Sequence, residues 1–396
     1  MLLKKRMKII YCTDNYWPRI SGMAVSIDAL KDGLANLGHE VYVFAPDYPN
    51  ASEFDKKAGN ASIFRFPSIK LFFLEEDRLV SPLQKRAVFA AMRSIKPDII
   101  HVHTEFSMGV YSSQYAKKHD IPLIYTAHTY WEEYANYISF LPNFIIKKVG
   151  ANLRNLPFKY DGLVTVPSSA MKTVLLTHCK QKPIRIIPTG IVMDEFGGVT
   201  KKNKCEIGKI ANLNIDFRNK FILLFVGRVG IEKNIDFLID VVAKIIQIIP
   251  NVVFLIVGDG PYREVLQKKV KQKKVDHCIF FTGYIQREKL KYMYTYADVF
   301  IFASKTEGQG LVIIESMQCG TPVVAIGEMG IKDIMGNNLG GFMVEDNVDE
   351  FCQKTLLLLK DKNIYQQKSR EALQFAGDWN NETSALKMQA LYQSVL

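Results

Sequence analysis

Short apolar runs alternate with helical patterns along the whole chain. In the first half, the runs at 7–14, 40–46 and 98–105 are separated by segments whose apolar residues recur at helical spacing. The second half repeats this alternation, from the run at 221–229 to the run at 321–326. Parallel strands that are covered on both faces read as continuous apolar runs between helices. The pattern therefore predicts an α/β protein built from doubly wound, Rossmann-like units.

The length of the chain indicates two such units. One hydrophobic core rarely organises 396 residues, so we expect two domains, each large enough to bury a core of its own. We place the first domain at 1–190 and the second at 191–378, with the junction in the segment PTGIVMDEF. The closing segment, 379–396, has apolar residues at helical spacing and predicts a terminal helix.

Composition narrows the compartment and the partners. The six cysteines show no paired spacing, which fits neither a disulfide framework nor a zinc site and indicates a reducing cytoplasm. The longest apolar region, 237–259, is interrupted by Asp240, Lys244 and Pro250, so we interpret it as helix, turn and strand and not as a membrane span. A net charge of +11 suggests an anionic partner without saying which one.

Two loops that follow strands have features of a phosphate site. In VGRVGIEKN, Arg228 and Lys233 would project from a loop that opens a helix, where backbone amides already favour anions. Solvated surface cations explain them equally well. In VGDGP, Gly258 would let a ligand approach the backbone, although a plain turn explains it equally well.

The stretch EGQGLVIIE has a different character, because it carries two acids eight positions apart. Glu307 falls in a loop after a predicted strand, and Glu315 falls in the helix that Leu311 begins. Gly308 and Gly310 would let backbone amides face a ligand near the start of that helix. Two carboxylates so placed can accept from two groups of hydroxyls on one elongated ligand. The alternative is a capping acid and an exposed helical glutamate.

Together these segments resemble the nucleotide-sugar half of glycosyltransferase family 4, whose GT-B architecture has two Rossmann-like domains facing across a cleft. The resemblance runs from about residue 221 to 344 and includes the G-R-x-x-x-E-K-N loop, the G-D-G-P turn and the E-x7-E pair. It implies that Arg228 and Lys233 hold the diphosphate, that Glu315 accepts from the ribose and that Glu307 lies beside the transferred hexose. It also implies donor contacts from the residues named above in the glycine-rich loops, and a terminal helix, 379–396, that completes the first domain.

The same resemblance extends to the N-terminal half. Ser21-Gly22 resembles the family's small-residue loop, and we include Gly22 among the donor-binding residues. His128 ends a predicted strand where the family places a histidine against the donor sugar, so we expect a catalytic role in place of a merely structural one. His101 and His103 share one face of their strand, and without a third nearby ligand we expect them to pack and not to bind a metal.

No D-x-D motif occurs in the chain, so we expect a metal-independent transfer in which Arg228 and Lys233 offset the charge of the leaving group. No cofactor is expected beyond the nucleotide sugar. The resemblance implies retention of anomeric configuration. No residue presents itself as a nucleophile.

The acceptor is indicated by a basic segment that begins near Asn143. Its apolar residues recur at helical spacing, and Lys147, Lys148, Arg154 and Lys159 supply charge, as in a helix that lies on an anionic bilayer. Packing on its own domain is the alternative.

The preceding stretch, HTYWEEYANYI, together with this segment resembles bacterial diacylglycerol glucosyltransferases. We therefore expect a peripheral enzyme at the inner face of the cell membrane that moves glucose or galactose from a UDP-sugar to 1,2-diacylglycerol. A soluble or polyprenyl-linked glycan acceptor, or a non-catalytic nucleotide-sugar-binding module, remains an alternative.

Two other classes fit poorly. The first strand is not followed by the G-x-G-x-x-G of nicotinamide enzymes, and no nucleic-acid-binding module is present.

Overall fold

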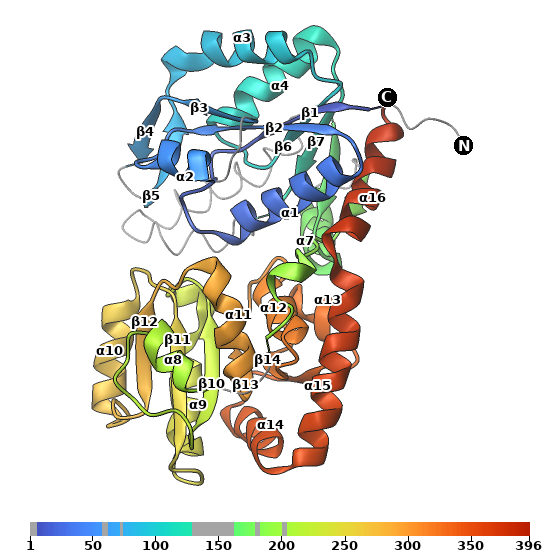
Figure 1. The fold of residues 1–396 in the computed structure, drawn as a ribbon. Coiled ribbons are helices and arrows are strands. Elements are labelled where there is room, and N and C mark those ends of the chain that lie inside the picture. Colours follow the sequence, from blue (N-terminus) through green and yellow to red (C-terminus); the bar gives the residue numbers. More distant parts are fainter. Residues whose placement is uncertain (1–5, 58–61, 72–73, 129–161, 179–182, 200–203) are drawn as a thin grey trace. The chain divides into compact units, whose positions relative to one another are not determined.

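A computed structural model describes residues 6–57, 62–71, 74–128, 162–178, 183–199 and 204–396. The chain folds as two compact units, the first comprising Met1–Gly190 with Asn381–Leu396 and the second Ile191–Asn380 (Figure 1). The predicted membrane-binding residues Lys147, Lys148, Arg154 and Lys159 lie outside the described residues.

The first unit is built on a parallel sheet of seven strands in the order β3-β2-β1-β6-β7-β8-β9. Strand β1 lies between β2 and β6, with Ile9 opposite both Val41 and Ile99. A separate antiparallel pair, β4 and β5, follows β3. The strands of this unit are β1 (Lys8–Cys12), β2 (Glu40–Pro46), β3 (Ile63–Phe66), β4 (Ser68–Leu71), β5 (Leu74–Val80), β6 (Ile99–Val102), β7 (Leu123–Thr126), β8 (Leu163–Val166) and β9 (Ile184–Ile186).

Helices connect these strands and supply the rest of the core. They are α1 (Gly22–Asn36), α2 (Ala51–Lys57), the 3-10 turn η1 (Pro82–Gln84), α3 (Lys85–Ile95), α4 (Ser107–His119), α7 (Ser169–His178) and, from the end of the chain, α16 (Asn381–Gln393). Helix α1 begins at Gly22, where the Ser21 hydroxyl accepts from the Ala24 amide at 3.1 Å and caps the helix. The helix ends before Gly38, whose φ of +90° suits glycine.

The terminal helix α16 is part of the first unit, where it packs beside α1 (Figure 1). Its residues Ala385, Met388, Leu391 and Tyr392 are buried in the same core as Ile27 and Leu34 of α1. Two buried histidines add polar contacts to it. His39 Nε2 forms a hydrogen bond of 2.7 Å with Gln389 Nε2, and His101 Nδ1 forms one of 2.7 Å with the Tyr392 hydroxyl.

The second unit has a parallel sheet of six strands in the order β12-β11-β10-β13-β14-β15. Its strands are β10 (Phe221–Val226), β11 (Val252–Val257), β12 (Ile279–Gly283), β13 (Val299–Phe302), β14 (Val323–Ile326) and β15 (Gly341–Val344). Its helices and 3-10 turns are η3 (Met193–Glu195), α8 (Cys205–Ile210), η4 (Ile231–Lys233), α9 (Ile235–Ile245), α10 (Arg263–Gln272), α11 (Arg287–Tyr296), α12 (Leu311–Gln318), α13 (Ile331–Met335), α14 (Val348–Lys360), α15 (Lys362–Ala376) and η5 (Gly377–Trp379).

The longest apolar region of the sequence is accounted for in this unit. Residues 237–259 contribute most of α9 and all of β11, which confirms the predicted helix, turn and strand. Every residue of β11 is buried, as expected of a central parallel strand. Within the described part of the chain, no helix is long and apolar enough to cross a bilayer.

Candidate functional site

Each of the two parallel sheets has a point at which the strand order reverses. Ligands of open parallel sheets bind beyond the carboxyl ends of the strands at such a point. In the second unit the reversal lies between β10 and β13. Arg228 and Lys233 follow β10, Gly258 follows β11 and Glu307 follows β13. The predicted donor-site residues of this unit are therefore gathered at the switch point of one sheet.

The loops after β10 and β11 are held together by backbone hydrogen bonds. The Gly227 amide donates to the Val257 carbonyl at 3.0 Å, and the Val229 amide donates to the Asp259 carbonyl at 2.9 Å. Gly258 has φ +129°, and a Cβ there would lie 1.9 Å from the Gly227 carbonyl oxygen. Only glycine fits this position. A glycine is therefore needed there both for a plain turn and for a ligand that approaches the backbone. Arg228, between these fixed loops, is partly exposed.

An ion pair spans the switch point. Lys233 Nζ lies 2.5 Å from Glu307 Oε1, and the two side chains are 20% and 18% exposed. The loop that carries Lys233 is tied to the end of β13, because Ser304 Oγ donates to the Glu232 carbonyl at 3.2 Å. The family resemblance implies that Lys233 contacts the diphosphate and Glu307 the hexose. In the structure they are direct partners, so any anion that approaches Lys233 also meets the carboxylate beside it.

Glu315 is buried, with 3% of its surface exposed, and the alternative of an exposed helical glutamate is wrong. Its Oε1 accepts from Arg287 Nη1 at 3.1 Å and its Oε2 accepts from the Tyr294 hydroxyl at 2.8 Å. Arg287 also donates from Nε to Glu195 at 2.9 Å. Burial and the neighbouring Glu315 carboxylate hold the pKa of Tyr294 well above its usual range, so Tyr294 remains a hydrogen-bond donor. These contacts fix the orientation of the Glu315 carboxylate.

Arg287 and Tyr294 were not predicted from the sequence. Both lie on α11, which packs against α12, the helix of Glu315. No motif spacing connects the two helices, and only tertiary packing brings the three side chains together.

The glycine-rich stretch between the two acids shapes the start of α12. Gly310 precedes the helix with φ +92°, and a Cβ there would lie 2.9 Å from Ile331 Cδ1. Leu311 is the first helical residue and packs partly against the core. Gly308 lies in the loop between β13 and α12, and the first amides of α12 follow it. Both are thus at the edge of the sheet where the ion pair lies.

At the switch point of the first unit, a buried carboxylate follows β1. Asp14 is 3% exposed and accepts from Thr104 Oγ1 at 2.7 Å, from the Ser107 hydroxyl and from the Met108 amide at 3.1 Å. These donors come from the loop after β6 and the start of α4. Burial raises the pKa of Asp14 to about 6, although the hydrogen bonds oppose that shift. The sequence interpretation did not single out Asp14, although its place directly after a buried strand was a usable signal.

The buried carboxyl group of Asp14 predicts a pH-dependent stability. Between pH 4 and 6 the unfolded chain releases this proton while the folded chain keeps it, so stability falls as pH rises through that window. The single group accounts for roughly 3 kcal/mol. We expect Asp14→Asn, which resembles the neutral acid, to lose roughly 3 kcal/mol less than wild type between pH 4 and 7 in chemical denaturation. Asp378→Asn changes an exposed carboxylate and is the charge control. Parallel curves for wild type and Asp14→Asn would contradict the assignment.

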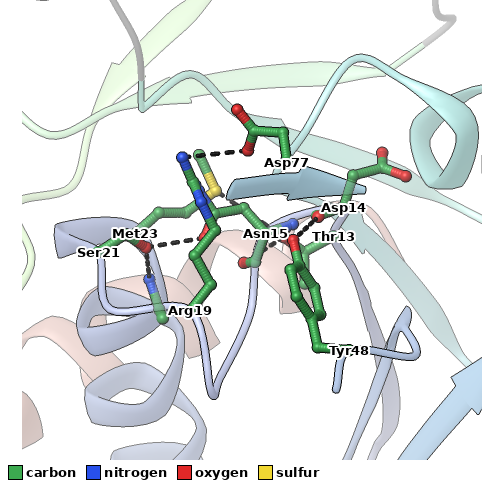
Figure 2. Close-up of polar contacts among 9 residues, drawn as sticks. Thr13, Asp14, Asn15, Arg19, Ser21, Met23, Tyr48 and Asp77 are labelled. Carbon is green, nitrogen blue, oxygen red and sulfur yellow. Dashed lines mark hydrogen bonds and ion pairs between the residues drawn. The ribbon is translucent and has the colours of Figure 1, made fainter. Parts of the chain in front are cut away.

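Polar contacts hold the loop from β1 to α1 in place (Figure 2). The Tyr48 hydroxyl donates to the Asp14 carbonyl at 3.0 Å, and Arg19 forms an ion pair with Asp77 at 3.0 Å. Gly22 lies at the other end of the loop as the exposed first residue of α1. A Cβ at Gly22 would meet no atom within 4 Å, so the fold itself does not require glycine there.

Three histidines lie together beside the same edge of the first sheet. The rings of His101 and His103 stack at 4.2 Å, which confirms that they share a face, and His103 Nδ1 forms a hydrogen bond of 2.9 Å with His128 Nε2. Burial lowers the pKa of His128 to about 4 and that of His101 to about 3. Burial and the other two imidazoles also lower the pKa of His103. Among the residues that the structure describes, no cluster of three histidine, cysteine or acidic side chains has the arrangement of a metal site.

Comparison with known families places this geometry in context. The model "Glycosyltransferase Family 4" matches residues 20–195, and the model "Glycosyl transferases group 1" matches residues 212–375. An alpha-monoglucosyldiacylglycerol synthase from Acholeplasma laidlawii is 30% identical over 98% of both chains. A synthase of the same description from Streptococcus pneumoniae is 31% identical over 85% of this chain and 74% of its own.

Solved structures agree on the fold. A structure of HepE from Anabaena in complex with UDP and glucose superposes with a TM-score of 0.77 at 17% identity, and covers 98% of this chain and all of its own. A sucrose-phosphate synthase from Thermosynechococcus elongatus superposes with a TM-score of 0.74 at 20% identity, over 98% of this chain and 99% of its own. With its two Rossmann-like domains, the chain has the predicted GT-B fold.

Proposed function

Since this chain belongs to glycosyltransferase family 4, we propose that it is a retaining enzyme that moves a hexose from a nucleotide sugar to a membrane lipid. UDP-glucose or UDP-galactose is the proposed donor, and 1,2-diacylglycerol is the proposed acceptor. The acceptor is supported by the two relatives described as alpha-monoglucosyldiacylglycerol synthases. The competing acceptor is a soluble or polyprenyl-linked glycan.

The ion pair at the switch point of the second sheet carries the proposal. Lys233 is an ammonium held beside the Glu307 carboxylate, so one edge of the sheet offers a cation to a diphosphate and an acceptor to sugar hydroxyls. As the glycosidic bond of the donor breaks, the leaving diphosphate gains negative charge, and Arg228 with Lys233 stabilises it. Two cations already in place reorganise little at that moment, which is why they can replace a metal ion.

Glu315 is proposed to accept from the ribose hydroxyls. Each of its oxygens already accepts one bond from the protein and keeps capacity for a second. Because Arg287 and Tyr294 already fix the carboxylate, binding of a ribose costs little additional side-chain entropy. His128, neutral at pH 7, is proposed to donate to a hexose hydroxyl.

The test is product identification. Purified protein is incubated with labelled UDP-glucose, UDP-galactose and GDP-mannose on vesicles with and without diacylglycerol, and each reaction is run both with and without EDTA. We expect label to enter hexosyl-diacylglycerol from a UDP-sugar, only when diacylglycerol is present, and at a rate that EDTA does not change. Label on a soluble or polyprenyl-linked glycan would select the competing acceptor. Nucleotide-sugar binding without any transfer would select the non-catalytic module.

Peripheral association with the inner face of the membrane is the second part of the proposal. Each of Lys147, Lys148 and Arg154 is expected to contribute about 1 kcal/mol near an anionic bilayer. Replacing all three by glutamate should therefore weaken binding to phosphatidylglycerol vesicles by about 3 kcal/mol or more, measured by sedimentation at rising salt.

The matched control replaces three exposed lysines of the second unit, Lys268, Lys271 and Lys274, by glutamate and makes the same change of net charge. It should sediment with vesicles as wild type does. Binding of UDP-sugar should be unchanged in both triple variants. Equal vesicle binding by wild type and the first variant would remove the support for a membrane-bound acceptor.

A further inference from the structure

The hydrogen bond between two neutral imidazoles has a direction, and the direction decides which tautomer each ring adopts. His103 follows β6 and His128 follows β7, two strands that are neighbours in the sheet. Their contact joins His103 Nδ1 to His128 Nε2 at 2.9 Å. One of these nitrogens carries a proton and donates, and the other accepts the hydrogen bond with its lone pair.

The surroundings of His103 select one of the two arrangements. His103 is 2% exposed, and its second ring nitrogen, Nε2, has no hydrogen-bond partner within the described part of the chain. If His103 accepted the bond at Nδ1, its own proton would sit on Nε2 as a buried N–H without an acceptor. A buried donor left unsatisfied costs about 1–3 kcal/mol, and such donors are rarer in proteins than unsatisfied acceptors. The arrangement with the proton on Nδ1 of His103 avoids that cost.

We propose that His103 is a positioning residue that donates its Nδ1–H to His128 Nε2 and so holds His128 as the tautomer protonated on Nδ1. The lowered pKa values of all three rings support this arrangement, because each ring then carries a single proton at pH 7. The backbone fixes His103 in turn, since its amide donates to the Cys12 carbonyl at 2.9 Å.

The consequence for transfer rests on the proposed function. A neutral His128 with its proton on Nδ1 is a donor to a sugar hydroxyl that brings no positive charge. The anomeric carbon becomes electron-poor as the glycosidic bond breaks, so a neutral donor near the ring is preferable to an imidazolium. His103 therefore acts through His128 and has no contact of its own with the donor in this scheme.

The test measures the tautomer directly in the full-length protein without any ligand. Long-range ¹H–¹⁵N correlation spectra of protein labelled in the imidazole nitrogens distinguish the two neutral tautomers, and the His128 signals are assigned by their loss in His128→Gln. We expect wild-type His128 to carry its proton on Nδ1. His103→Leu should shift His128 to the Nε2-protonated form or to a mixture.

Two further variants separate positioning from packing. In His103→Asn the side-chain amide places an N–H near the former Nδ1, so the wild-type tautomer of His128 should return. Thr126→Val alters the partner of His101 Nε2, which bonds Thr126 at 2.6 Å, and should leave the tautomer of His128 unchanged. Wild-type His128 protonated on Nε2, or an unchanged tautomer in His103→Leu, would overturn the proposal.

Kinetics distinguish this inference from the proposed function. His103→Leu is expected to lower kcat for hexose transfer by about tenfold or more with little change in KM for the nucleotide sugar, and His103→Asn should recover most of it. If the tautomer shifts as expected while kcat does not change, His103 still positions His128, and the proposed contact between His128 and the donor sugar is the part that fails.

Discussion

Replacing Lys233 by methionine is expected to lower kcat for hexose transfer by about 10²–10³-fold, which is the effect of removing one positioned donor to a charge that develops in the transition state. Methionine keeps the length of the side chain and removes the charge. The loss has two sources, because Lys233 also neutralises Glu307 at 2.5 Å. Without the ammonium, the carboxylate faces the departing diphosphate and repels it.

The control is a lysine at the same edge of the sheet that pairs with a different acid. Lys305 follows β13 and forms an ion pair with Asp346, with both side chains nearly half exposed. Lys305→Met removes one charge from the same edge of the sheet and should change kcat less than twofold, because exposed ion pairs contribute little.

A second variant tests the repulsion. In Lys233→Met/Glu307→Gln the uncompensated carboxylate is gone, so the two substitutions should not be additive in a double-mutant cycle. Circular dichroism and thermal melting establish that each variant is folded. Wild-type kcat in Lys233→Met would remove Lys233 from the diphosphate site.

The sequence was informative where chemistry follows directly from a strand. The apolar runs located the parallel strands, and the rule that ligands bind beyond their carboxyl ends pointed to Arg228, Lys233 and Glu307. Glycine at positions 258 and 310 was also a usable signal. Both residues have a positive φ in the structure, a conformation that favours glycine. The family resemblance drawn from these motifs is confirmed by the family models and by a synthase that aligns with 98% of the chain.

What the sequence could not predict depends on helices and strands that pack from distant positions. Glu315 is oriented by Arg287 and Tyr294, which lie 28 and 21 residues before it on another helix. His128 forms a hydrogen bond with His103, which lies 25 residues away after the neighbouring strand. None of these three separations falls within a single helix or strand, so no local pattern contains them.

Removing residues 381–396 is expected to unfold the first unit. Met388, Leu391 and Tyr392 of α16 are at most 9% exposed and pack in one core with α1 and the central strands. Truncating one such side chain in a core typically costs about 2–5 kcal/mol, and a whole domain is stable by only about 5–15 kcal/mol. The combined free-energy cost of losing all of these side chains, together with the hydrogen bonds of His39 and His101, should exceed the free energy of unfolding of the unit.

The measurement is limited proteolysis with thermal unfolding, and point variants make it quantitative. Met388→Ala removes a side chain that is 2% exposed and should destabilise by about 2–5 kcal/mol. Leu386→Ala lies on the same helix at 46% exposure and should change stability by less than about 0.5 kcal/mol. A truncated chain that resists protease and melts like wild type would show that the helix is dispensable. Equal effects of the two alanine variants would show that the buried face of α16 does not stabilise the first unit.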